Sequence, residues 1–150
     1  MEKFLEVLDD EEREKLYNAP VYVGLLGALE DGKITRHHEK DAIDLVHVRT
    51  FSSPKSLHDY YMKAEVFFEA KLKLVEEWLP NDVEAAKAML REKLNETKEI
   101  LDKLENEEFV TDLRLSLRSF ADHVSQSAGH WGKALAIFVD PFMEIDINKK

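Results

Sequence analysis

The sequence predicts an all-α protein, a single-domain helical bundle of about five to six helices around a buried second helix. Three observations predict this fold class. Apolar residues recur at steps of three and four, as they do on the buried face of a helix. Residues suited to beginning or ending helices separate these segments, and the 150 residues include only five Gly and four Pro. A chain of this length usually forms one domain, so we expect residues 1–150 to share one core.

The first two predicted helices follow one another closely. Asp9 or Asp10 can cap the first helix, which should run to about Tyr17. Asn18 can then cap a second helix that has Pro20 in its first turn, where the missing N–H costs no hydrogen bond.

The second helix, residues 21–29, is apolar on almost every side. A soluble protein buries such a helix among its other helices. Gly24 and Gly27 have no Cβ, so we expect them to let a neighbouring helix approach closely. A glycine loop that binds phosphate would need a pattern such as GxGxxG, which the sequence lacks.

A third and a fourth helix are expected next. Gly32 is placed to end the second helix, and Thr35 can cap the third. Ser53 and Pro54 begin a fourth helix that should continue without a break to Trp78. Its predicted apolar face consists of Leu57, Tyr60, Tyr61, Ala64, Phe67, Phe68, Val75 and Trp78.

Two more helices complete the predicted bundle. Asp82 caps a fifth helix that reaches about Leu104, and it should form a long helical hairpin with the fourth. Asn106 caps the last clear helix, which we expect to end near Gly129.

Residues 131–150 form an ambiguous tail. The run from Ala134 to Val139 suits either a short helix or a buried extended segment, and the residues after it alternate like a strand. We expect its aromatic side chains to pack on the core.

Charge and composition narrow the classes of partner. The formal net charge is −10, which repels phosphate backbones, so we predict no nucleic-acid partner. The chain has no cysteine, which excludes disulfides and thiolate metal sites. No run of about 20 apolar residues predicts a membrane span, and no apolar core follows a basic start as in a secretory signal. We therefore expect a cytoplasmic protein.

The start of the third helix gathers histidines and carboxylates. The run from His38 begins like the HExxH zinc motif, but Ala42 stands where the second histidine should be. His37 and His38 are about 100° apart on a helix, so they do not easily converge on one ion. His37, Asp41 and Asp44 do share one helix face and could bind zinc or manganese. We favour the alternative, a solvated polar face.

The Glu-Asp-Gly sequence ending at Gly32 is similar to part of a calcium loop. However, Ala28 and Leu29 occupy positions where oxygen ligands would be needed. The interpretation we favour is that Asp31 helps to satisfy free N–H groups at the start of the third helix. Glu39 would then face the positive end of that helix.

Part of the sequence resembles a known family. Asn-Ala-Pro at residues 18–20 leads into an apolar helix, followed by EDGKI at residues 30–34 and by Glu39. This pattern resembles the first half of TerB-like proteins, the helical family associated with tellurite resistance. Residues 124–131, VSQSAGHW, are similar to a late segment of some family members. A second Asp-Gly-x-Ile turn with its glutamate is not found.

The resemblance, mainly over residues 18–48, implies an all-helical fold and a non-enzymatic binding or scaffold role linked to stress or metal response. It also implies acidic ion ligands, of which Asp31 and Glu39 match the pattern. Our leading hypothesis is therefore a TerB-like module that holds a divalent cation, with no other cofactor. The candidate metal ligands are Asp31, His37, Glu39 and Asp41.

Two alternatives belong to other functional classes. The protein could recognise a protein partner through an apolar patch of the tail, formed by Trp131, Phe138, Phe142 and Met143. It could instead be a metal-dependent hydrolase that uses the third helix, through His37, Asp41, Asp44 and His47.

Overall fold

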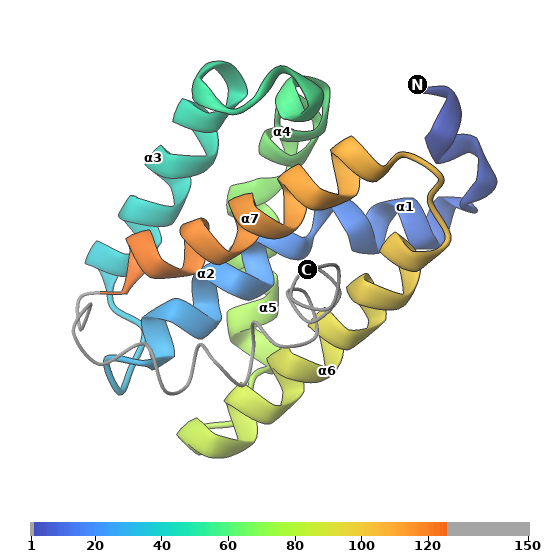
Figure 1. Ribbon diagram of the computed structural model, residues 1–150. Coiled ribbons are helices and arrows are strands. Elements are labelled where there is room, and N and C mark those ends of the chain that lie inside the picture. The colour runs from blue at the N-terminus through green and yellow to red at the C-terminus, as the bar shows by residue number, and fades with distance from the viewer. Residues whose placement is uncertain (1, 126–150) are drawn as a thin grey trace, which may run out of the picture.

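The structure is a computed structural model that describes residues 2–125. All regular structure within this range is helical, as predicted (Figure 1). The last helix ends at Val124, where Ser125 takes an extended backbone, which is earlier than the predicted end near Gly129. The predictions for the tail, residues 131–150, lie outside the described residues, as does Gly129 itself. In chain order the elements are the 3₁₀-helix η1 (Lys3–Val7), α1 (Asp10–Tyr17), α2 (Ala19–Leu29), α3 (Arg36–Ser52), the 3₁₀-helix η2 (Lys55–Leu57), α4 (His58–Val66), α5 (Phe68–Trp78), α6 (Val83–Asp102) and α7 (Glu107–Val124).

Helix α2 is the centre of the bundle (Figure 1). All of its residues, Ala19–Leu29, are buried, which confirms the prediction made from its apolar sequence. It packs against α1, α3, α5, α6 and α7, with its most extensive contacts to α6 and α7. A helix without a polar face is stabilised most when every side of it is removed from water.

The two glycines of α2 let α7 approach at backbone distance. A Cβ built on Gly27 would lie 2.4 Å from the carbonyl oxygen of Ala121. A Cβ on Gly24 would meet the ring of Phe120 at 3.3 Å. The close approach predicted for both positions is therefore present, and at Gly27 it is made against rigid backbone.

Most predicted helix starts are confirmed by side-chain hydrogen bonds. Asp9 accepts from the N–H of Glu12 at 2.8 Å, and Asp82 accepts from the N–H of Ala85 at 2.9 Å. Asn106 caps α7 by accepting from Phe109 N at 3.0 Å, and Thr35 caps α3.

Asn18 does not cap α2 with its side chain, contrary to the prediction. Its backbone is itself helical, with φ −84° and ψ −6°, so α1 passes into α2 with little interruption. A side-chain N-cap normally needs an extended backbone at this residue.

The prediction that the fourth helix continues without a break is wrong. It divides into η2, α4 and α5, and the break between α4 and α5 is at Phe67, where φ is −115° and ψ is 15°. Phe68 is buried, whereas Phe67 is 71% exposed and Val66 is 66% exposed. The periodic pattern placed both phenylalanines in the core, but three consecutive apolar residues span about 200° of a helix and cannot all face inward.

The predicted hairpin of the fourth and fifth helices is also wrong. Helix α6 packs chiefly on α2 and α1, while α5 packs on α2, α3 and α4. A side-chain contact does join them, because Lys93 Nζ on α6 lies 5.9 Å from the centre of the ring of Trp78, the last residue of α5. Each helix therefore buries its apolar face against the central α2 rather than against the other.

Within residues 2–125, no helix combines the length and the apolar character needed to cross a membrane.

The contact at Gly27 predicts unequal responses to alanine at the two glycines. Gly27→Ala forces the backbones of α2 and α7 apart, and we expect it to cost about 1 to 3 kcal/mol of unfolding free energy. Gly24→Ala meets a ring that can shift, and the better helix propensity of alanine offsets part of the strain. Thermal unfolding of both variants checks this. Equal melting temperatures would contradict the close contact at Gly27.

Candidate functional site

The loop between α2 and α3 forms a closed hydrogen-bond network. Gly32 has φ +97°, the left-handed conformation predicted for it. Thr35 Oγ1 accepts from the N–H of His38 at 3.2 Å, and His38 Nδ1 accepts from the N–H of Thr35 at 3.0 Å. This is a capping box in which histidine takes the place of the usual glutamate or glutamine.

Asp31 completes this network from the other side of the His38 imidazole ring. Because His38 Nδ1 accepts a hydrogen bond, the ring proton lies on Nε2, which donates to Asp31 Oδ2 at 2.6 Å. Ser125 at the end of α7 also donates to Asp31, at 3.5 Å. Asp31 therefore supports the start of α3 through His38, rather than through the backbone N–H groups as predicted. The Thr-x-x-His spacing was the sequence signal that could have shown this.

Glu30, next to Asp31, holds the end of α2 against α6. Its carboxylate lies 3.0 Å from Lys87 Nζ, and both side chains are nearly buried. The sequence showed Glu30 only as part of the Glu-Asp-Gly turn. Its partner is more than 50 positions away and could not be identified without the fold.

The four candidate metal ligands are not gathered at one point. Asp31 pairs with His38, while His37 Nε2 pairs with Asp41 Oδ2 at 3.3 Å on the exposed side of α3. Glu39 lies instead on the side of α3 that faces α5, where it lines a cleft together with Glu76. His37 and His38 diverge as predicted, with side chains 63% and 4% exposed. No group of three or more His, Asp or Glu side chains in residues 2–125 could hold a metal ion.

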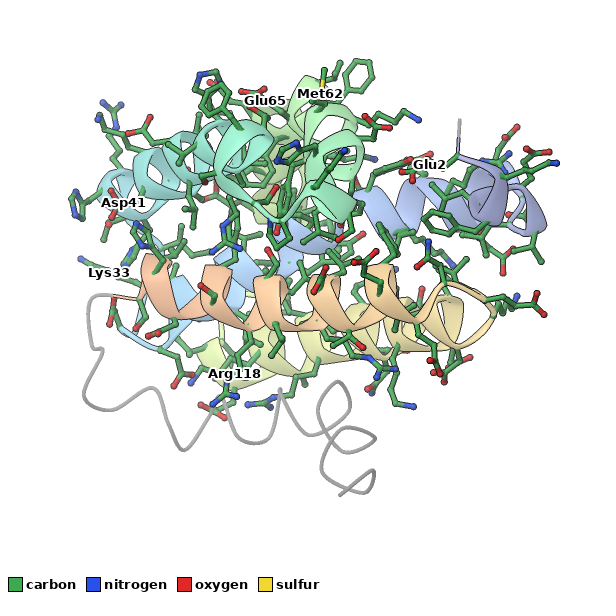
Figure 2. All side chains as sticks on the ribbon, turned by 45° about the horizontal axis from the view of Figure 1, so that its top comes forward. Glu2, Lys33, Asp41, Met62, Glu65 and Arg118 are labelled. Carbon is green, nitrogen blue, oxygen red and sulfur yellow. The ribbon has the colours of Figure 1, made fainter. Side chains whose placement is uncertain are left out.

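The candidate hydrolase residues are likewise divided into separate pairs. Asp44 pairs with Lys40 at 3.2 Å, and His47 pairs with Glu65 of α4. Asp41 and Glu65 lie well apart in Figure 2, so the His37 and His47 pairs are separate sites. These side chains do share one face of α3, but they are spread along its surface and do not meet at one point.

An acidic pair between α3 and α5 was not predicted. Glu39 and Glu76 line an open cleft of about 790 Å³, together with Arg36, Lys40 and Lys73. One carboxylate oxygen of Glu76, Oε2, is buried, and no N–H or O–H group in the described residues reaches it. Burial, then the hydrogen bond and negative charge of Glu39, raise the pKa of Glu76 to about 8. A proton on Glu76 relieves the repulsion between the two carboxylates.

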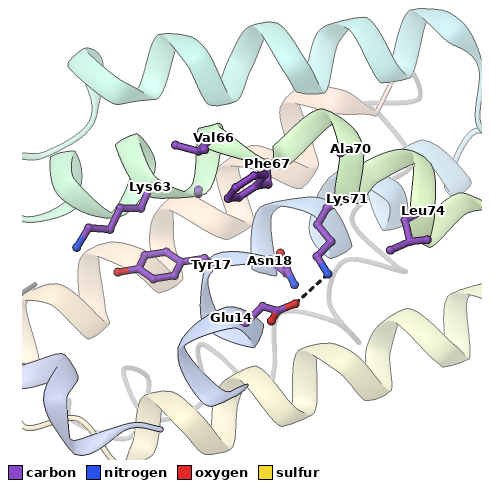
Figure 3. Close-up of a pocket in the computed structure, with 10 residues that line it drawn as sticks. Glu14, Tyr17, Asn18, Lys63, Val66, Phe67, Ala70, Lys71 and Leu74 are labelled. Atoms are coloured by element: carbon purple, nitrogen blue, oxygen red, sulfur yellow. Dashed lines mark hydrogen bonds and ion pairs between the residues drawn. The ribbon is translucent and has the colours of Figure 1, made fainter. Parts of the chain in front are cut away.

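An apolar groove lies on the other side of α5, against α1. It has a volume of about 640 Å³. In Figure 3, Lys63, Phe67, Lys71 and Leu74 lie along one side and Glu14, Tyr17 and Asn18 along the other. The remaining lining residues are Ala64, Val66 and Ala70.

The break between α4 and α5 creates the mouth of this groove. It turns Val66 and Phe67 outward, and Leu74 two turns along α5 is also 49% exposed. The small side chains of Ala64 and Ala70 leave space between them. An ion pair between Lys71 Nζ and Glu14 Oε1, 2.9 Å apart, links the two walls (Figure 3). The groove thus offers apolar contact area with a charged rim.

The α1 wall is held in place by aromatic packing. The rings of Tyr17 and Tyr60 stack with centres 5.4 Å apart, and Tyr60 donates to the carbonyl oxygen of Leu16 at 2.6 Å. Tyr60 is buried in α4. The groove is therefore bounded by elements that are anchored in the core.

The chain matches no protein-family model, no curated protein and no solved structure in the comparisons made with known proteins. The assignment to the TerB-like family accordingly stays a prediction.

The network at Asp31 predicts a structural role for its carboxylate. Asp31→Ala leaves the buried Nε2–H of His38 without its partner, and we expect a loss of about 1 to 3 kcal/mol in unfolding free energy. Asp44→Ala, at an exposed ion pair of α3, should change stability by less than about 0.5 kcal/mol. Urea unfolding with and without EDTA measures both. A loss at Asp31 that needs added Ca²⁺, Mn²⁺ or Zn²⁺ would instead indicate an ion.

The acidic pair predicts a pH-dependent stability. The pKa of Glu76 is raised from 4.5 to about 8 in the folded protein, so the folded state holds a proton that the unfolded state has lost between these values. Stability contributed by this group therefore falls as pH rises through that window. Glu76→Gln should reduce the fall in Tm between about pH 5 and pH 9.

Glu77→Gln, a change at an exposed neighbour that lines the same cleft, is the matched control and should leave the pH profile close to that of the wild type. Identical profiles for the wild type and Glu76→Gln would contradict the raised pKa.

Proposed function

We propose that this protein is a non-enzymatic helical binding module whose partner, an apolar segment of another protein, docks in the groove between α1 and α4–α5. The observation that carries the proposal is the exposure of Phe67 and Val66 at the mouth of a preformed groove. An exposed Leu or Phe alone is ordinary on a protein surface. Contiguous apolar residues around a concave surface are typical of interaction sites.

The energetics favour such an occupant. Complete burial of one large apolar side chain contributes about 1.5 to 3 kcal/mol. Phe67, Val66, Met62 and Leu74 are each about half exposed or more, so a partner can still remove much of their surface from water. Met62 projects from α4 at the surface in Figure 2, one helical turn before Val66.

The proposal keeps the binding role implied by the TerB-like resemblance and gives it a different surface. A link to stress or metal response rests on the resemblance alone. The tail patch predicted as an interaction surface lies outside the described residues. The hydrolase hypothesis finds no support in the separate ion pairs of α3.

A photo-crosslinking experiment tests the groove. A benzoylphenylalanine at position 67 should capture a partner in cells, whereas the same residue at Phe51, which is 65% exposed on α3 and does not line the groove, should not capture it. The captured protein is then purified and its affinity measured. We expect Phe67→Ser to weaken binding by about tenfold or more, and Phe51→Ser by less than about twofold.

Both substitutions replace exposed side chains and should change stability by no more than about 0.5 kcal/mol, so lost binding will not reflect unfolding. Equal affinity of the wild type and Phe67→Ser for the captured protein would overturn the proposal.

A further inference from the structure

A small pocket lies between α3 and α7, and it shares no lining residue with the groove. It has a volume of about 410 Å³, which is within the range of pockets that hold small molecules. Its lining includes Leu45, Arg49 and Ser52 of α3 and Asp112, Leu115 and Ser119 of α7. The pocket therefore combines one cation, one carboxylate, hydroxyl groups and apolar side chains.

The guanidinium of Arg49 is held in a fixed position at this pocket. Its Nη1 donates to the carbonyl oxygen of Ser116 at 2.7 Å, to Ser116 Oγ, and to the hydroxyl of Tyr61 at 3.4 Å. The guanidinium carbon also lies 5.5 Å from the centre of the Phe120 ring. Tyr61 and Phe120 are buried, so the contacts that orient Arg49 belong to the core. A cation oriented in this way loses little side-chain entropy when it binds a ligand.

The positive charge of Arg49 is not matched by a carboxylate. Its acceptors are a carbonyl oxygen and hydroxyl groups, and no Asp or Glu within residues 2–125 forms an ion pair with it. Nη2 donates to Ser119 Oγ at 3.0 Å, which leaves the N–H of Nε and one N–H of Nη2 without an acceptor in the described part of the chain. Neighbouring N–H groups of a guanidinium match the two oxygens of a carboxylate.

Two hydroxyl groups add to these donors. Ser52 and Ser119 are exposed and line the pocket, and their O–H groups donate to no acceptor among the described residues. Ser119 is in direct contact with Arg49. The pocket thus presents donors to an anion from both α3 and α7.

The rest of the lining limits the charge and shape of that anion. Asp112 accepts from Ser56 Oγ at 2.6 Å and also lines the pocket, so it repels an anion in proportion to its charge. A carboxylate carries one negative charge, whereas a phosphate group carries about 1.5 to 2 at pH 7. Leu45 and Leu115, of which Leu115 is 46% exposed, offer apolar contact to a short hydrocarbon chain.

We infer that this pocket binds the carboxylate of a small organic acid that has a short apolar chain. Arg49, Ser52 and Ser119 donate to the carboxylate oxygens, and Leu45 and Leu115 contact the chain. The site is separate from the groove, so the inference does not depend on the proposed function.

Three small molecules test the inference on the full chain, in a buffer free of other carboxylates and of phosphate. They are butanoate, its uncharged counterpart butanamide, and inorganic phosphate. Titrations followed by NMR chemical shifts give their affinities. We expect butanoate to bind at least about tenfold more tightly than butanamide, because the amide has no negative charge to pair with Arg49. Phosphate should bind severalfold more weakly than butanoate.

Substitutions locate the binding. Arg49→Lys keeps the charge but removes the planar pair of N–H groups, and we expect butanoate to bind about tenfold more weakly. Arg118→Lys, at an exposed arginine of α7 that does not line the pocket, is the matched control and should leave the affinity unchanged. Ser119→Ala should weaken butanoate severalfold. Asp112→Asn should strengthen phosphate more than butanoate.

Arg49 also joins α3 to α7, so the fold of each variant is checked by circular dichroism. Ser119 is exposed, and its substitution keeps the test valid if Arg49→Lys does not fold. Equal affinities for butanoate and butanamide, or no saturable binding of butanoate, overturn the inference. Tighter binding of phosphate than of butanoate also overturns it, as does an equal loss in Arg49→Lys and Arg118→Lys, which indicates non-specific attraction.

Discussion

The burial of α2 is the constraint on which the rest of the structure depends. This helix has no polar face, so α1, α3, α5, α6 and α7 all pack on it, and its eleven residues are removed from water together. Gly27 makes the arrangement specific, because only a residue without a Cβ fits against the carbonyl of Ala121. A central helix enclosed in this way prevents α5 and α6 from forming the simple hairpin that their order in the chain suggests.

The polar residues near the end of α2 serve this arrangement. Glu30 pairs with Lys87 of α6, and Asp31 holds the ring of His38 at the start of α3. The last carbonyl oxygens of α2 accept from the backbone N–H groups of Glu30, Asp31 and Gly32, so the side chains of Glu30 and Asp31 are available to join α2 to α6 and α3. Within the cluster that resembles a metal site in the sequence, Asp31 and His38 thus serve to connect two helices.

Helix α5 links the two surface features of the molecule. One side carries Ala70, Lys71 and Leu74 into the apolar groove, and another carries Lys73 and Glu76 into the cleft against α3. The break at Phe67 sets the direction of α5 relative to α4 and so determines the position of both the groove and the cleft. The groove is the feature suited to recognition, because its apolar surface remains exposed while its walls are anchored in the core.

The sequence by itself determined the all-helical class, the burial of α2 and most of the helix starts, because these depend on local spacing, capping residues and turn glycines. Gly32 and Thr35 could be assigned from their neighbours alone. Only the tertiary structure decided that Glu39 meets Glu76, that Glu30 meets Lys87 and that Phe67 faces water while Phe68 faces the core. These outcomes depend on which helices α2 brings together, and contacts between residues distant in the chain leave no periodic trace in one sequence.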